Sequence, residues 1–222
     1  MCGRFTLHQS AKDVAARFGV DVPDDLQPRF NIAPMQQVAA IVQEDEPRFQ
    51  RLKWGLVPFW AKEASIGNRM INARAETLAE KPAYRRAIAK RRCLIPADGF
   101  YEWQRDGNVR TPMHIVRRDR GLFAFAGIWE TWRAPDESEL RTCSIITVEP
   151  NALLSTIHNR MPAILQASVE RTWLSPDTKV ADALSLLVPY ADDDFEAHAV
   201  SRRVNSPMTD DALCIEPVEA NG

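Results

Sequence analysis

The chain has 222 residues, of which 45% are apolar and 26% charged, and its formal net charge is −2. This balance is typical of one globular domain, and it excludes a disordered or fibrous protein and one that coats nucleic acid indiscriminately. Its apolar runs are too short to cross a bilayer and no secretory pattern is present, so we expect a cytoplasmic protein without a membrane partner.

The first predicted element is a short helix after an irregular N-terminal segment. Ser10 and Asp13 form a capping-box pattern, and Gly19 closes the helix. We therefore expect residues 1–9 to be free to enter a site. Strand-like runs follow, separated by Pro, Gly or charged turns, at residues 38–42, 49–57, 93–103, 113–117, 122–132 and 142–148.

The remaining elements suggest the fold class. Asp106-Gly107 indicates a hairpin between two of the strands. Ser168 and either Asp177 or Thr178 are the expected N-caps of the later helices. Helical spacing occurs at residues 81–90, 169–174 and 180–187. Strands outnumber helices and do not alternate with them, which predicts an α+β fold around a mainly antiparallel, barrel-like sheet with flanking helices.

The small net charge hides an asymmetry between the two halves. Residues 1–118 contain 20 Lys and Arg against 13 Asp and Glu, whereas the remainder contains 8 against 17. The densest basic stretch, residues 85–92, fits either a phosphate-binding face or a solvated helix surface.

The four cysteines are far apart and form no C-x-x-C pair, so we expect no metal and no cofactor. Cys93, Cys143 and Cys214 lie in apolar stretches and are expected to be buried free thiols. Cys2 differs, because removal of Met1 would create an N-terminal 1,2-aminothiol. Its amine and thiol, with reference pKa values of about 7.7–8.0 and 8.5, can together close a thiazolidine ring on an aldehyde.

Six separated blocks occur in one order along nearly the whole chain. They are MCGRF at 1–5, FNIAP at 30–34, WGLVP at 54–58, NARAET at 72–77, RCLIPADGFYEW at 92–103 and IHNRMP at 157–162. Together they resemble the SOS response-associated peptidase (SRAP) family. The resemblance implies a single SRAP domain over residues 1–222 that shields abasic sites in single-stranded DNA by covalent cross-linking. It also implies removal of Met1 by autoproteolysis or by an aminopeptidase.

The resemblance makes Cys2 the nucleophile and places Asn72, Glu102 and His158 around it. An abasic deoxyribose is mostly a closed hemiacetal, so ring opening and the later loss of water need a general acid–base. Desolvation in its apolar run can raise the pKa of Glu102, and the reference pKa of a histidine such as His158 already lies near the working pH. Asn72 can hold a sugar hydroxyl or the amine. From the residues alone, Glu102 could instead pair with a basic residue, and His158 could be a satisfied loop histidine.

Three arginines lie beside the proposed catalytic residues, and the resemblance supports phosphate binding by Arg4, Arg74 and Arg160. Ion pairs that organise the site, with Glu76 or Glu102, are the alternative role. In the aromatic segment 54–60 we assign Trp54 to the core, and Phe59 or Trp60 to stacking on DNA.

Two further groups of residues have weaker assignments. The segment 201–205 also resembles the family, and Arg202 or Asn205 is a candidate to line the site. His8, His114 and His198 match no block and are expected to be structural or surface groups.

The predicted function is that of a monomeric enzyme that cross-links to single-stranded DNA containing abasic sites, in the cytoplasm and at the nucleoid when DNA is bound. A cysteine-type peptidase or amidohydrolase that uses Cys2 is the alternative. A noncovalent binder of single strands is a third possibility, and it leaves Glu102 and His158 unexplained.

Overall fold

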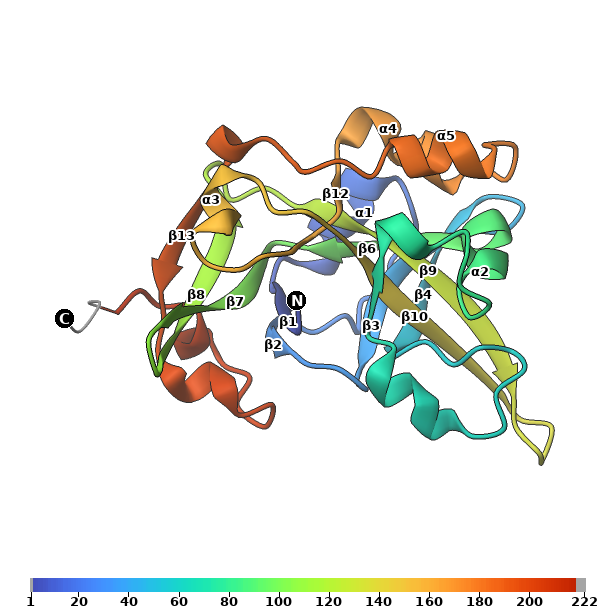
Figure 1. Ribbon diagram of the computed structural model, residues 1–222, viewed down its shortest axis with the longest axis horizontal. Helices are drawn as coiled ribbons and strands as arrows, with labels where there is room; N and C mark the ends of the chain where they lie inside the picture. The colour runs from blue at the N-terminus through green and yellow to red at the C-terminus, as the bar shows by residue number, and fades with distance from the viewer. Residues whose placement is uncertain (1, 219–222) are drawn as a thin grey trace.

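The strands form two sheets, which lie side by side in Figure 1. The structure is a computed structural model and describes residues 2–218. Helices and loops cover the outside, as predicted for an α+β fold around a barrel-like, mainly antiparallel sheet. Within residues 2–218, no helix combines the length and the apolar character needed to cross a membrane.

The larger sheet contains a closed five-stranded barrel. Its strands pair in the order β10-β4-β3-β6-β9, and β9 pairs again with β10 to close the ring. Only the β4–β10 pairing in the ring is parallel. Closure pairs the edges that an open sheet would expose. These strands are β3 Gln37–Gln43, β4 Pro47–Trp54, β6 Arg92–Ala97, β9 Phe123–Arg133 and β10 Glu139–Val148.

Three short strands extend the barrel sheet near the predicted site. Strand β5 Asn72–Arg74 pairs in parallel with β10, and β11 Met161–Pro162 pairs antiparallel with it. Strand β12 Ile164–Leu165 pairs with β9. The pairings on β10 bring the segment of Asn72 close to the segment that follows His158.

The smaller sheet is antiparallel, with the strand order β13-β8-β7-β1-β2. Alternation along its strands directs Phe5, Phe100 and Ile115 into the barrel core, and Tyr101 and His114 to the opposite face. Its strands are β1 Arg4–Leu7, β2 Arg29–Ile32, β7 Gly99–Asp106, β8 Val109–Arg117 and β13 Phe195–Ala199.

Helices pack on the barrel and between the strands. Among them, α2 lies against β9 and α4 against β6, on different sides of the barrel in Figure 1. The α-helices are α1 Ala11–Phe18, α2 Arg85–Lys90, α3 Ala152–Ser155, α4 Ala167–Leu174 and α5 Val180–Ser185. The 3₁₀ helices are η1 Ala64–Arg69, η2 Ala75–Thr77, η3 Asp192–Asp194, η4 Arg202–Asn205 and η5 Ala212–Cys214.

Aromatic packing holds the N-terminal segment against the barrel. The Phe5 ring on β1 makes edge contacts with Trp54 at 5.3 Å and with Phe125 at 5.7 Å between centroids. All three rings are buried, and such pairs contribute about 0.5–1.5 kcal/mol beyond their area. The prediction that residues 1–9 are irregular is therefore wrong, because residues 4–7 form β1 and pair with both β2 and β7.

The prediction of a single strand over residues 93–103 is also wrong, because this stretch forms two strands that belong to different sheets. The chain turns at Asp98, whose carboxylate accepts hydrogen bonds from Thr6 Oγ1 at 2.6 Å and from the backbone N–H groups of His8 at 2.6 Å and Gln9 at 3.0 Å. These bonds tie the corner between β6 and β7 to the end of β1. Residues 55–57 likewise do not continue β4, and Gly55 has φ of +139°.

Local capping predictions have a mixed outcome. The Ser10–Asp13 capping box and the left-handed Gly19 are confirmed in α1, and the hairpin is confirmed by Gly107 at φ +56°. The N-caps predicted for the later helices are wrong, because α4 begins after Gln166 and α5 begins after Lys179. Helix α2 is shorter than predicted, because residues 81–84 precede it as turns.

Candidate functional site

Cys2 lies just before β1 and is fully buried in the core cluster. Its Sγ is 3.7 Å from the carbonyl oxygen of Arg4, to which the thiol donates. Burial, followed by the negative charge of Glu102, raises the pKa of the thiol well above its usual range. The thiol therefore stays protonated until a nearby base removes its proton.

Asn72 on β5 contacts Cys2 directly. Its Nδ2 donates a hydrogen bond of 2.7 Å to the Cys2 carbonyl oxygen. Strand β5 is held in place by its pairing with β10, in which Asn72 lies opposite Ile145. The Asn72 Oδ1 atom is buried and has no hydrogen-bond partner among residues 2–218, so this acceptor is available to a bound donor.

Glu102 on β7 is the acidic group beside Cys2. Its side chain points to the barrel side of the sheet, opposite Met113 on β8, and the residue is 2% exposed. Burial raises the pKa of Glu102 to about 7, although the backbone N–H of Trp103 lowers it in part. A carboxyl group with this pKa can both donate and accept a proton near neutral pH.

His158 lies in the loop after α3. Its Nδ1 lies 3.1 Å from the backbone nitrogen of Arg160 and 3.3 Å from the Arg160 carbonyl oxygen, so it accepts from the N–H in one tautomer and donates to the carbonyl oxygen in the other. Burial, together with the positive charge of Arg105, lowers the pKa of the imidazole. A bond of 3.1 Å from Gln104 Nε2 to the carbonyl oxygen of Thr156 ties this loop to β7, the strand of Glu102.

The guanidinium of Arg160 is engaged inside the protein. It forms a two-pronged ion pair with Glu76, with bonds of 2.7 and 3.0 Å, and donates to the Thr147 carbonyl oxygen at 2.6 Å. This pairing lowers the pKa of Glu76. The bonds link η2, which follows the strand of Asn72, to the loop of His158. Thr147 had no distinguishing signal in the sequence.

Arg4 is likewise tied to the protein. Its guanidinium donates to Asn31 Oδ1 at 2.8 Å and to the carbonyl oxygens of Val204 and Asn205 at 2.5 and 3.2 Å. Desolvation lowers its pKa. These bonds join β1 to β2 and to η4 through neutral acceptors, and none of them is the ion pair with Glu76 or Glu102 that the sequence suggested as the alternative role.

The predicted DNA-contact residues of the 59–74 region are exposed. The exposed fractions are 47% for Phe59 and 50% for Trp60, whereas Trp54 is fully buried, as expected for a core residue. Arg74 is also exposed. The guanidinium of Arg86 lies 4.4 Å from the centre of the Phe59 ring, which joins the aromatic segment to α2.

The basic stretch 85–92 divides into two parts. Arg85, Arg86 and Lys90 are exposed, as both interpretations of the stretch require. Arg91 pairs with Glu130, and Arg92 is buried, where it donates to main-chain carbonyl oxygens including that of Ile88. Only the first part is accessible to a nucleic acid.

The C-terminal segment reaches the strand of Glu102. Trp103 Nε1 donates a 2.8 Å hydrogen bond to Asn205 Oδ1, so Asn205 lies next to the site strand, while Arg202 is exposed. Cys93, Cys143 and Cys214 are buried free thiols, as predicted. Among residues 2–218, no group of three or more potential metal ligands is arranged to hold an ion.

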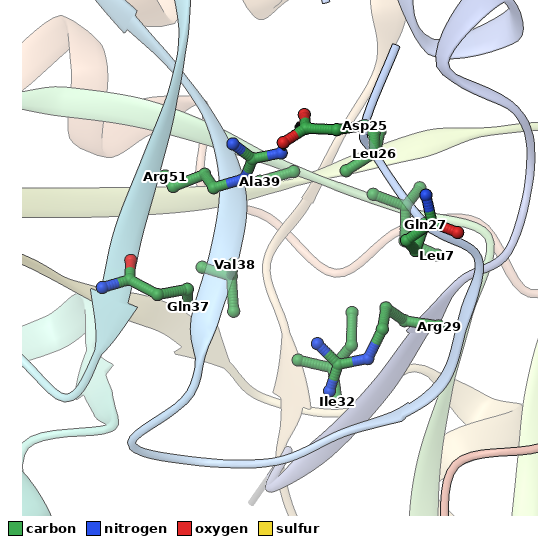
Figure 2. A pocket seen from close by; sticks show the side chains of 10 residues that line it. All are labelled: Leu7, Asp25, Leu26, Gln27, Arg29, Ile32, Gln37, Val38, Ala39 and Arg51. Carbon is green, nitrogen blue, oxygen red and sulfur yellow. Dashed lines mark hydrogen bonds and ion pairs between the residues drawn. The ribbon is translucent and has the colours of Figure 1, made fainter. Parts of the chain in front are cut away.

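A hollow of about 190 Å³ lies away from these residues, and Figure 2 shows its lining. Asp25 and Arg51 form an ion pair of 2.5 Å there. The ten lining residues include no thiol, no imidazole and none of the predicted site residues. The candidate site is the region of Cys2, Asn72 and Glu102, with the His158 loop beside it, because Asn72 hydrogen-bonds to Cys2 and the charge of Glu102 acts on the Cys2 thiol.

Comparison with known proteins gives consistent results. A family model described as SOS response associated peptidase (SRAP) matches residues 1–207. The abasic site processing protein YoaM of Bacillus subtilis is 48% identical, with 97% of this chain and 98% of the relative covered. The abasic site processing protein HMCES of Gallus gallus is 33% identical, with 87% of this chain and 67% of the relative covered. A crystal structure of a protein from Bacteroides thetaiotaomicron, 31% identical, superposes with a TM-score of 0.90, covering 98% of this chain and all of that chain.

Proposed function

The chain belongs to the SRAP family, and from that membership and the site geometry we propose that it forms a covalent thiazolidine cross-link with abasic sites in single-stranded DNA. The names of its relatives support abasic-site processing. The observation that carries the proposal is the grouping of a fixed Cys2, a hydrogen-bonded Asn72 and a Glu102 whose pKa is about 7.

The proposed reaction begins after Met1 is removed, which frees the amine of Cys2. The amine attacks C1′ of the open-chain abasic sugar, and the carbinolamine loses water to give an iminium ion. The Cys2 thiol then adds to the same carbon as its proton leaves, closing the thiazolidine. One water is released in total, and no oxidant or reductant is needed.

Glu102 is assigned the proton transfers. With a pKa of about 7 it can protonate the departing hydroxyl and then accept the proton of the buried, neutral thiol. His158 is assigned a similar role at the sugar oxygen during ring opening and reversal. Asn72 fixes the Cys2 carbonyl through Nδ2, while its Oδ1 can accept from the amine or from a sugar hydroxyl.

The accessible cations and aromatic side chains support binding of the flanking DNA. Exposed Arg74 can contact a phosphate, and Phe59 or Trp60 can stack on an unpaired base. Arg160 would reach a phosphate by exchanging it for the Glu76 carboxylate. All of these groups belong to one chain, so the proposal assigns the activity to a monomer that acts in the cytoplasm, at the nucleoid when DNA is bound.

The peptidase alternative is less well supported by the electrostatics of Cys2. An acyl-transfer cysteine works best as a thiolate beside a cation, which lowers the thiol pKa. Here burial and the negative charge of Glu102 raise it. A purely noncovalent DNA-binding role would give the buried acid Glu102 no task beside Cys2.

One experiment separates the cross-link from the two alternatives, which both predict no stable adduct with DNA. The protein is incubated with single-stranded oligonucleotides that contain or lack an abasic site and is then run on a denaturing gel. We expect a stable adduct only with the abasic strand. Cys2→Ala should abolish it while leaving noncovalent binding within about a few-fold, since one thiol contributes little to phosphate contacts. Cys2→Ser should give a weaker, reducible Schiff base. An undiminished stable adduct with Cys2→Ala would overturn the thiazolidine mechanism.

A further inference from the structure

The face of the small sheet opposite Glu102 carries a second group of titratable side chains. His114 on β8 lies opposite Tyr101 on β7 and opposite His198 on β13. Glu102 and Tyr101 are consecutive, so their side chains point to opposite faces of the sheet. This group is therefore separate from the Cys2 site.

A cavity of about 250 Å³ opens on this face. Its polar lining comes from His8, Asp98, His114, Arg120 and His198, and its apolar wall includes Val116 and Ile215. Three of the chain's four histidines thus border one cavity, while His158 lies at the Cys2 site. A water occupies about 30 Å³, so the space exceeds what one water fills.

His114 has unmet hydrogen-bonding capacity in the cavity wall. The residue is 2% exposed, and neither ring nitrogen has a hydrogen-bond partner among residues 2–218. Its ring stacks on Tyr101 at 4.7 Å, and a Cβ at Gly99 would lie 2.3 Å from Nε2, so the ring is closely confined. A buried polar group left unsatisfied costs about 1–3 kcal/mol, which a bound partner would recover.

The donor groups of the cavity lining suit an anion, while its carboxylate, Asp98, lies 3.7 Å from the His8 ring. The one carboxylate in the lining, Asp98, already accepts hydrogen bonds from Thr6, His8 and Gln9. Arg120 contributes a guanidinium from the loop after β8, although it also pairs with Glu196 on β13. His8 and His198 add imidazole rings, each with a ring N–H that can donate a hydrogen bond.

We propose that this cavity binds a small oxyanion, a phosphate or a carboxylate group, through an N–H of His114 with Arg120, His8 and His198 around it. Burial, followed by the neighbouring His198, keeps the pKa of His114 below its usual range, so that its ring is a neutral donor. The groups that face His114 are His8, Asp98, Tyr101, Arg120 and His198.

The test is an NMR titration of the histidine ring nitrogens in the full chain with inorganic phosphate, and separately with acetate. We expect saturable shifts at His8, His114 and His198, with a dissociation constant of about 1 mM. His158 is the internal control, because it reports any binding of the anion at the Cys2 site. Stronger binding of one anion would identify which oxyanion the cavity prefers.

Two matched variants make the result specific. Arg120→Gln should weaken binding about tenfold, because the anion loses a charge-assisted hydrogen bond. Arg118→Gln should leave it unchanged, since Arg118 also pairs with Glu196 but does not line the cavity. Both side chains are mostly exposed, so neither change threatens the fold. Unsaturable shifts, equal shifts at His158, or equal effects of the two variants would overturn the proposal.

Discussion

The interior and the rim of the candidate site are built in opposite ways. Around Cys2, Asn72 and Glu102 are held by strands, and burial shifts the pKa values of both the thiol and the carboxyl group. On the rim, Trp60 and Arg74 are exposed. The difference teaches that changes in the interior should alter reaction rate, whereas changes on the rim should alter DNA affinity.

The arginines show how this division depends on tertiary partners. Arg4, Arg74 and Arg160 have the same relation to the predicted catalytic residues in the sequence. In the fold, Arg4 and Arg160 donate to protein acceptors, whereas Arg74 is exposed. Arg74 is therefore the arginine of the three that is most accessible to a phosphate.

The largest effect is expected from the acid–base groups of the interior. Glu102→Gln and His158→Ala should each slow cross-linking by about 10²–10⁴-fold without preventing it, because the nucleophile remains. Single-turnover rates at saturating DNA measure this. His158→Ala should also lengthen the lifetime of a preformed adduct, followed by release of labelled DNA into excess competitor. Faster release would instead assign His158 to support of the Arg160 loop.

Glu102 should also make the stability of the protein depend on pH in the absence of DNA. Its pKa is raised from about 4.5 to about 7, so the folded state binds more protons and the wild type loses stability as pH rises between these values. Relative to Glu102→Gln, the loss in unfolding free energy should be about 3–4 kcal/mol, complete above pH 7 and absent below about pH 4.5. Denaturant unfolding across this range measures it. A constant difference between the two proteins would show that Glu102 is not desolvated.

The aromatic rim should contribute affinity alone. Trp60→Ala should weaken binding to intact and abasic single strands alike by about 1–3 kcal/mol, the usual contribution of one stacked base. Its cross-linking rate at saturating DNA should be unchanged. Val109→Ala, which alters an exposed apolar side chain at the start of β8, is the matched control. A rate defect in Trp60→Ala would move this residue into the reactive interior.

The smallest effects should separate the arginines. Arg74→Gln should weaken binding to all single strands and reduce the slope of log affinity against log salt by about 0.7, the value for one phosphate contact. Arg160→Gln should lower the unfolding free energy by about 1–3 kcal/mol, because Thr147 loses its charged donor. The slope of log affinity against log salt should fall less for Arg160→Gln than for Arg74→Gln, because DNA must displace Glu76 before a phosphate can contact Arg160. The reverse pattern would make Arg160 the main phosphate contact.

What the sequence predicts well is local. Ser10, Asp13 and Gly19 cap α1 through contacts within a few residues, and the apolar run around Glu102 already indicates its raised pKa. The two-residue strand β11 has too short a pattern to recognise and exists because β10 pairs with it. The β6–β7 corner depends on bonds between Asp98 and residues near position 8, about 90 positions away.

The site shows the same limit. The six sequence blocks predict Cys2, Asn72 and Glu102 as site residues, but the sequence does not reveal that Phe5 anchors the Cys2 segment on the barrel. The ion pair of Glu76 with Arg160 joins residues 84 positions apart. Pairings at such separations are set by the tertiary fold, so residue type alone left open whether Arg160 binds DNA or organises the site.

The most direct measurement is the intact mass of the protein after incubation with an abasic single strand, with Cys2→Ala in parallel. Thiazolidine formation predicts a species whose mass is that of the chain without Met1 plus the oligonucleotide minus one water. The variant and an intact strand should give none. An adduct of equal yield on a chain that retains Met1, or on Cys2→Ala, would contradict the proposed role of the N-terminal aminothiol.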